Sequence, residues 1–152
     1  MFLDDMPEPQ RSALLDHLMP DLGETPCVGG PPLARRRIAL VTTAALHGFR
    51  DPPFVPGRAE YRVIPDDMDM GALVTSHVST NIDRIGILND IDTVFPIHRL
   101  RELVAAGAVG ATAPRHYSFM GATPPMAYAE LIAEVADEMK RDRVEGIVLA
   151  PV

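Results

Sequence analysis

The chain has 152 residues, of which 47% are hydrophobic and 23% are charged, and its formal net charge is −7. This length predicts one domain around one core, and the acidic balance argues against a nucleic-acid-binding surface. Because no apolar run reaches the roughly 18–20 residues that span a bilayer, and the N-terminus does not resemble a signal peptide, we expect a cytoplasmic protein.

Residues 1–34 are expected to form an appendage outside the core. A short amphipathic segment carries Leu14, Leu15 and Leu18 on one side, and a linker rich in glycine and proline follows. The linker holds the sole cysteine, Cys27, which excludes an intrachain disulfide. Its turn-forming neighbours offer no base or helix N-terminus to activate the thiol, which favours a structural or incidental cysteine over a nucleophile.

Short apolar segments predict the strands of a single domain at residues 35–152. The clearest is 38–43, an apolar, β-branched run typical of a fully buried parallel strand. Further short strands are predicted at 73–75 and 108–112, and a final one at 144–152. Strands that alternate with helices imply right-handed crossovers and a doubly wound, mostly parallel sheet with few strands, in the α/β class.

Two amphipathic helices are predicted between these strands. Pro96 starts the first, whose apolar residues share one face, and Gly107 ends it. Thr123 is expected to cap the second, with Pro124 in its first turn. The segment 47–69 is longer than most connections, which favours a binding loop or a contact with a partner.

Histidines provide the main evidence for a site. His47, His77 and His116 each follow a predicted strand, so their side chains meet at one sheet edge if those strands are parallel. An imidazole exchanges protons near neutral pH, which suits a catalytic acid or base. The adjoining loops carry side chains that orient these rings or hold a substrate carboxylate, namely Asp83, Arg84, Asp90, Arg115 and Tyr117. His17 and His98 fall on predicted helices and are expected to be surface residues.

The same histidines have other interpretations. Each ring could hydrogen-bond its own loop and satisfy buried backbone groups. A metal site built from all three is a further alternative, although the sequence lacks the H-x-x-x-H spacing typical of zinc or iron ligands. Glycine-rich nucleotide-binding motifs, a G-x-S-x-G elbow and a C-x-x-C pair are also absent, so no nucleotide cofactor is predicted and the cofactor stays unassigned.

Several segments are similar, in order and spacing, to those of one enzyme family. They read IALVTTAALH at 38–47, YRVIP at 61–65, DIDTVFPIHRLREL at 90–103 and PRHYSFMG at 114–121. Over residues 36–152 the chain resembles the selenoprotein B-like subunits of the glycine/sarcosine/betaine/D-proline reductase family. The resemblance implies a subunit of a multi-subunit oxidoreductase that reductively cleaves a C–N bond with a selenocysteine or cysteine nucleophile.

The nucleophile of that family has no counterpart here. In the family, the stretch similar to residues 148–152 continues into the segment that bears the redox cysteine or selenocysteine, and Cys27 lies outside the matched region. The resemblance carries over His47, His77 and residues 115–117 as positions at the edge of the pocket.

Three hypotheses follow. In the first, a partner chain supplies the redox cysteine or selenocysteine, His77 or His116 protonates the leaving amine, and Arg115 holds the carboxylate of a small amino-acid-like substrate. In the second, the chain is a non-catalytic substrate-binding or scaffold subunit. In the third, it is a metal-dependent enzyme that uses His47, His77 and His116. An exposed apolar final strand at residues 147–149 favours a homo- or hetero-oligomer in any of these cases.

Overall fold

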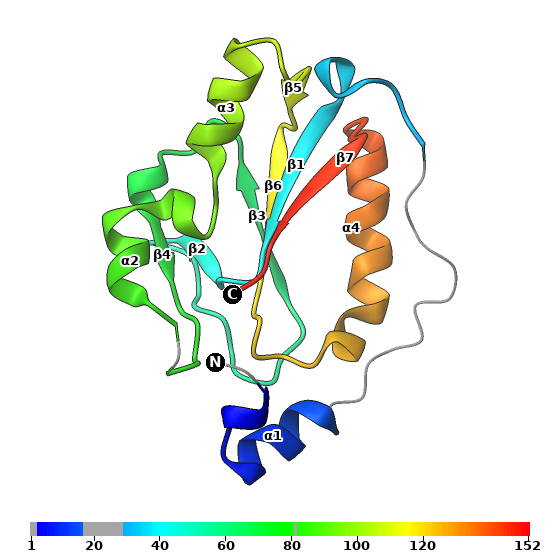
Figure 1. Ribbon diagram of the computed structural model, residues 1–152. Coiled ribbons are helices and arrows are strands. Elements are labelled where there is room, and N and C mark those ends of the chain that lie inside the picture. Colours follow the sequence, from blue (N-terminus) through cyan, green and yellow to red (C-terminus); the bar gives the residue numbers. More distant parts are fainter. Residues whose placement is uncertain (1–2, 17–28, 81) are drawn as a thin grey trace.

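The computed structural model describes three stretches of the chain, residues 3–16, 29–80 and 82–152 (Figure 1). The predictions made for Leu18, His17 and Cys27 therefore lie outside the described residues. Near the N-terminus, a 3₁₀ turn at Leu3–Asp5 precedes helix α1 (Glu8–Leu15), which is the predicted amphipathic segment. Among the described residues, no helix has the length and apolar character needed to cross a bilayer.

The main sheet is built around β1 (Arg37–Thr42). On one side, β7 (Gly146–Ala150) pairs with it in parallel over most of its length. On the other side, β5 (Ala111–Thr112) pairs in parallel with its start and β6 (Arg115–Phe119) with its end. β3 (Tyr61–Pro65) then pairs antiparallel with β6. The described residues thus form a five-stranded, mostly parallel sheet, which confirms the predicted α/β class.

The chain leaves this sheet directly after β1. Ala45, with φ of 51°, adopts the left-handed backbone that is uncommon for residues other than glycine, and leads into β2 (Leu46–Gly48). β2 pairs antiparallel with β4 (Leu73–Thr75) in a separate two-stranded sheet. The prediction that 73–75 continues the parallel sheet is therefore wrong, because a three-residue strand carries too little periodicity to specify its partner.

Helices cover both faces of the main sheet, as predicted for a doubly wound fold. α2 (Arg84–Asn89) and α3 (Ile97–Ala105) lie on one face and α4 (Ala129–Arg141) on the other (Figure 1). α3 is the first predicted helix, and the predicted stop signal, Gly107, follows its last residue closely with a φ of 71° that is accessible to glycine at little cost.

α4 starts later than the sequence suggested. The prediction that Thr123 caps it is wrong: Pro125–Tyr128 form a 3₁₀ turn first, and α4 begins at Ala129 without a side-chain cap. A residue that precedes a proline is held in an extended conformation, so Pro124, which is followed by another proline, cannot begin the helix. The Thr123 hydroxyl is buried without a hydrogen-bond partner among the described residues.

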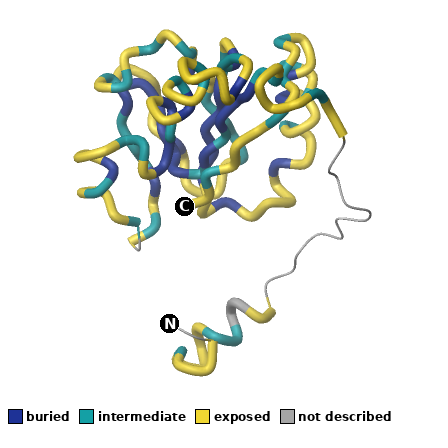
Figure 2. The backbone as a smooth tube through the Cα atoms, turned by 45° about the horizontal axis from the view of Figure 1, so that its top comes forward, coloured by how far each residue is buried: buried dark blue, intermediate teal, exposed yellow. Residues whose placement is uncertain are grey.

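The sheet separates two apolar cores, and Figure 2 shows the buried positions concentrated in its central strands. Ile38 and Leu40 of β1 face α2 and α3, whereas Ala39 and Val41 face α4. Each large apolar side chain that is fully buried contributes roughly 1.5–3 kcal/mol to the stability of the fold. The first core also holds Ile64, Phe95, Ile97 and Leu100, and the second holds Tyr117, Phe119, Tyr128, Val135 and Met139.

Candidate functional site

The carboxyl ends of β1, β6 and β7 meet at Thr43. Its carbonyl accepts from the Gly121 N–H at 2.9 Å, and its hydroxyl accepts from the Val152 N–H at 2.8 Å. The end of β4 and the loop after it reach the same edge, where the Thr75 hydroxyl donates to the Ala44 carbonyl at 2.7 Å and the Ser76 N–H donates to the Ala45 carbonyl at 3.1 Å. Ligands of open α/β sheets bind outside the carboxyl ends of the strands, so this edge is the candidate site.

His77 lies in the loop that returns to this edge, and its side chain is buried. Its Nδ1 accepts from the Ser79 N–H at 3.1 Å, so the neutral ring carries its proton on Nε2. Burial, followed by the positive charge of Arg84, lowers the pKa of His77 below its ordinary value, which keeps the ring neutral at pH 7. Nε2 is buried without a hydrogen-bond partner among the described residues. Buried donors are rarely left unpaired, and this one suits a ligand or a water.

Arg84 and Asp83 hold the His77 loop in place. The Arg84 Nη2 donates to the carbonyls of His77 at 2.7 Å and Ser79 at 3.0 Å. Asp83 caps α2, because its Oδ1 accepts from the Gly86 N–H at 2.9 Å. The other guanidinium nitrogens of Arg84 make no hydrogen bond to a described residue, which leaves them able to bind an anion.

A cleft of about 270 Å³ opens at this edge between α2 and the residues that follow β7. Its walls are made of Ile82, Asp83, Gly86, Ile87, Thr93, Val94, Pro151 and Val152. Clefts that bind drug-sized molecules measure about 300–1,000 Å³, so this one suits a smaller organic molecule.

His47 lies within β2 and is bound to its own strand. Its Nδ1 donates to the Gly48 carbonyl at 2.9 Å, and its buried ring lies 6.4 Å from the ring centre of Phe54. His47 follows β1, as expected, but it lies within β2 of the small antiparallel sheet and not in a loop at the carboxyl edge of the parallel sheet. The contacts match the alternative in which the ring satisfies a local backbone group.

His116 follows β5, the strand predicted at 108–112, but it lies inside a further strand, β6, where the sequence predicted a loop. Pro114, which has no N–H for the ladder, separates β5 from β6, and the chain then continues as a strand. The His116 Nδ1 accepts from the Leu40 N–H at 3.0 Å, and its Nε2 donates to the Asp66 Oδ1 at 3.1 Å. Burial lowers the pKa of His116, and Asp66 opposes this shift. Both ring nitrogens are therefore satisfied within the core.

Arg115 and Tyr117 alternate with His116 along β6 and so face α4 instead. The Arg115 guanidinium donates to both Asp142 oxygens, from Nε at 2.7 Å and from Nη2 at 2.9 Å. The Tyr117 hydroxyl donates to Glu138 at 3.1 Å. Burial and this carboxylate raise the pKa of Tyr117, and the hydrogen bond from Arg115 lowers the pKa of Asp142. These polar groups are already paired with α4.

The predicted site residues thus occupy separate places. They divide into His77, Asp83 and Arg84 in and beside the loop that reaches the carboxyl edge, His47 in the small sheet, His116 beneath β1, and Arg115 and Tyr117 beside α4. Nowhere in the described part of the chain do three histidine, cysteine, aspartate or glutamate side chains gather closely enough to hold a metal ion. The geometry therefore gives no support to a three-histidine metal site.

Sequence reasoning missed Asp66, the partner of His116. Its Oδ2 also accepts from the Thr112 hydroxyl at 2.9 Å, and its backbone carbonyl accepts from Arg101. Asp66 follows an edge strand and is paired with residues far along the chain, so no local motif could identify it.

Comparisons with known proteins agree on one family. Residues 33–152 match the family described as glycine/sarcosine/betaine reductase selenoprotein B. The chain is also 32% identical over 115 residues to the D-proline reductase subunit gamma of Acetoanaerobium sticklandii, a match that covers 74% of this chain and 47% of that protein. The chain therefore spans about half the length of the curated relative that it matches. No solved structure matches it.

Proposed function

Because the chain belongs to the glycine/sarcosine/betaine reductase selenoprotein B family, we propose that it is a subunit of a reductase that cleaves the C–N bond of a small amino-acid-like substrate. The match over residues 33–152 is the observation that carries this proposal. The similarity to a D-proline reductase subunit supports the same class of reaction.

A partner chain supplies the thiol or selenol in this proposal, because residues 33–152 contain no cysteine. The thiolate or selenolate attacks the carbon that bears the amino group, and the electron pair of the C–N bond leaves with the amine. Where the substrate nitrogen is not already cationic, its departure needs a proton, so a titratable group of this chain at the carboxyl edge would assist the step.

His77 is the favoured group for that role. Its Nε2–H lacks a partner among the described residues, whereas both nitrogens of His116 are engaged. A lowered pKa makes the protonated ring a stronger acid than an ordinary imidazolium, and the neutral ring still donates a hydrogen bond. The uncommitted nitrogens of Arg84 favour it over Arg115, which is paired with Asp142, as the group that holds a substrate carboxylate.

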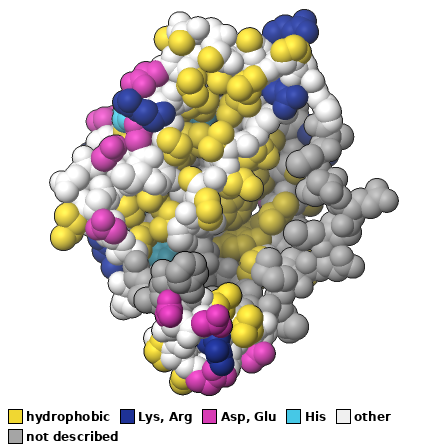
Figure 3. All heavy atoms as spheres, in the orientation of Figure 1, with side chains coloured by type: hydrophobic (Ala, Val, Ile, Leu, Met, Phe, Trp, Pro, Cys, Tyr) yellow, Lys and Arg dark blue, Asp and Glu magenta, His cyan; other side chains and the backbone are white. Residues whose placement is uncertain are grey.

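The outer edge of β7 is the proposed contact with the partner chain. Ile147, Val148 and Leu149 are exposed, the last of them by 70%, and an exposed edge strand readily pairs with another chain. An apolar groove of about 360 Å³ lies beside this strand, between α4 and the sheet, with Ile132 on its wall. In the orientation of Figure 1, Figure 3 shows hydrophobic side chains gathered over the middle of the molecule.

Turnover by the reconstituted complex tests this proposal. Glycine, sarcosine, betaine and D-proline are offered to the chain alone, to its cysteine-bearing partner alone and to both together, with a dithiol as reductant. We expect cleavage only in the mixture, detected as the free amine from glycine, sarcosine or betaine and as the ring-opened amino acid from D-proline. We expect this cleavage to be lost when Leu149→Lys weakens the contact. Turnover by the isolated chain, or none by an intact complex, would contradict the proposal.

A non-catalytic binding or scaffold subunit is the second candidate. It is favoured by the number of predicted site side chains that are engaged in structural hydrogen bonds, among them His47, His116, Arg115 and Tyr117. Under this second candidate function, the chain binds a small amino acid, but the assembled complex does not convert that amino acid to a product.

A further inference from the structure

A second and larger cleft lies on the other side of α2 from the carboxyl edge. It measures about 580 Å³ and is bounded by β4, by the turn that precedes it and by α2 and α3. Ile87 of α2 contributes to the walls of both clefts, so this short helix separates them. Of the candidate site residues that the sequence analysis named, Asp90 lines this larger cleft, whereas His47, His77 and His116 do not.

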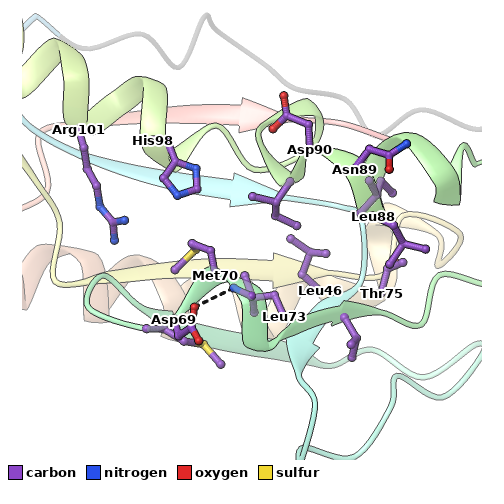
Figure 4. Close-up of a pocket in the computed structure, with 15 residues that line it drawn as sticks. Leu46, Asp69, Met70, Leu73, Thr75, Leu88, Asn89, Asp90, His98 and Arg101 are labelled. Atoms are coloured by element: carbon purple, nitrogen blue, oxygen red, sulfur yellow. Dashed lines mark hydrogen bonds between the residues drawn. The ribbon is translucent and has the colours of Figure 1, made fainter.

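The floor of the cleft is apolar. Leu46, Leu73 and Ile87 are buried residues of the core that also border the cleft, and Met70 packs partly buried against them. Figure 4 shows Leu46, Leu73 and Met70 close together in the middle of the cleft. An apolar surface of this kind favours the hydrocarbon part of a ligand.

The α3 end of the cleft is cationic. Figure 4 shows His98 and Arg101 projecting from α3 into the space above Met70. The side chain of Asp92 is only 9% exposed and fixes the His98 ring, because its Oδ1 lies 3.1 Å from the His98 Nδ1. The opposite ring nitrogen, Nε2, makes no hydrogen bond to a described residue. Arg101 donates through Nη2 to the Asp66 carbonyl, and the same nitrogen lies 3.7 Å from the Asp66 Oδ1. Its Nε and Nη1 make no hydrogen bond to a described residue and can bind an anion.

The two carboxylates that border the cleft are already engaged. The Asp69 Oδ1 accepts from the Gly71 N–H at 3.0 Å, the bond drawn in Figure 4, and the Asp90 Oδ1 accepts from the Asp92 N–H at 3.0 Å. In Figure 4 the Asp90 carboxylate is turned away from Leu46 and Leu73. The cleft therefore combines a basic end with an apolar floor, and its two bordering carboxylates each hold a backbone N–H of their own turn.

We propose that this cleft binds a small organic carboxylate with an apolar body and no ammonium group. The carboxylate pairs with Arg101 and the His98 Nε2, the latter when the ring is protonated, and the hydrocarbon lies on Leu46, Leu73 and Ile87. This site is distinct from the proposed reaction at the carboxyl edge and does not depend on a partner chain.

Cyclopentanecarboxylate is the probe, and ¹H–¹⁵N spectra of the full chain are the measurement. Saturable shifts are expected at the amides of Gly71, Thr75 and Leu88, which border the cleft. The neutral cyclopentanecarboxamide is expected to bind at least about tenfold more weakly, because a charge-assisted hydrogen bond contributes about 1.5–3 kcal/mol. D-proline, which adds an ammonium, is also expected to bind more weakly.

Substitutions of the cationic end complete the test. Arg101→Gln is expected to weaken binding of the carboxylate about tenfold. If Arg101→Gln fails to fold because it loses the contact with Asp66, His98→Gln tests the same end and is expected to weaken binding several-fold. The matched control is Lys140→Gln on α4, which removes one positive charge away from the cleft, with an expected change below about twofold.

Three results would overturn the proposal. The first is the absence of a saturable shift at millimolar carboxylate. The second is equal affinity for the carboxamide, which would remove the assignment of an anion. The third is tighter binding of D-proline than of cyclopentanecarboxylate, which would make this cleft an amino-acid site.

Discussion

Two buried histidines of this protein sit in regions with different hydrogen bonding. His116, beneath β1, is fully buried and uses both ring nitrogens, toward Leu40 and Asp66. His77, in the loop at the carboxyl edge, is buried to nearly the same extent but uses only Nδ1, and its Nε2–H has no partner among the described residues. Burial lowers the pKa of both.

The difference shows that burial and a shifted pKa do not by themselves distinguish a structural histidine from a functional one. A satisfied ring such as His116 links strands and stabilises the fold. A ring with an unpaired donor, such as His77, carries an energetic cost that a ligand can relieve. The remaining hydrogen-bonding capacity is therefore the property on which we base the assignment of His77.

The largest expected effect is on the structural histidine. His116→Ala leaves the Leu40 N–H and the Asp66 carboxylate without their partner and opens a cavity, so we expect a loss of about 3–4 kcal/mol in the free energy of unfolding. Urea denaturation measures it. His116→Asn, whose side-chain oxygen can still accept from Leu40, is expected to lose less. Equal stability of wild type and His116→Ala would remove the structural assignment.

The next effect concerns His77 and separates its two nitrogens. In His77→Asn, the side-chain oxygen replaces Nδ1 as the acceptor for Ser79, while the Nε2–H is lost. We expect turnover of the assembled complex to fall at least about 100-fold, in the range of general acid catalysis, with unfolding free energy within about 1 kcal/mol of wild type. His77→Gln keeps a donor near Nε2 and should retain more activity. Unchanged turnover in His77→Asn would place the chemistry elsewhere.

A smaller effect is expected on the α4 side of the sheet, where the polar groups are also satisfied. Asp142→Asn removes the charge that pairs with Arg115 at 2.7 Å, at an expected cost of about 1–2 kcal/mol in unfolding free energy. Turnover should not change, because we assign this pair to the fold. A large rise in KM with little loss of stability would instead return Arg115 to the role of a substrate-binding residue.

The smallest effect is a dependence of stability on pH. Because the pKa values of His77 and His116 are lowered in the folded protein, the unfolded chain binds protons first as the pH falls below about 6.5. Stability is therefore retained above about pH 7 and lost below it, by at most about 1.4 kcal/mol per pH unit for each histidine. The pKa of Asp142 is also lowered, and this carboxylate contributes a further loss of stability only below about pH 4.

Urea titrations between about pH 7.5 and 5.5 measure this dependence. The slope should become shallower in His77→Asn and in His116→Asn, since each removes one titrating ring. If neither variant changes the slope, other groups are responsible for the acid sensitivity.

Much of the fold could be predicted from local sequence patterns. The buried strand β1, the final strand β7 and α3 with its Gly107 terminus have strong apolar periodicity or a specific stop signal. The small β2–β4 sheet could not be predicted, since it depends on a left-handed turn at Ala45 and on strands of three residues. These features arise from tertiary contacts and leave no local pattern.

The site was predictable only in part. Arg84 donates to the backbone carbonyl of His77, so these two predicted residues lie together, and their roles at a site stay a prediction. The positions of His116 and Arg115 on opposite faces of one strand could not be foreseen, because the sequence pattern ended the third strand at 112 and left both residues in a loop. Once β6 is known to begin at Arg115, the alternation of side chains explains both positions.

The most direct test of the central claim is the mass of the native, untagged complex combined with a count of its thiols and selenols under denaturing conditions. Our account predicts a complex in which a partner chain adds at least one redox-active thiol or selenol to Cys27, the single cysteine of this sequence. A homo-oligomer with one thiol per chain would contradict it, and the carboxyl edge with His77 would then be a binding site without a nucleophile.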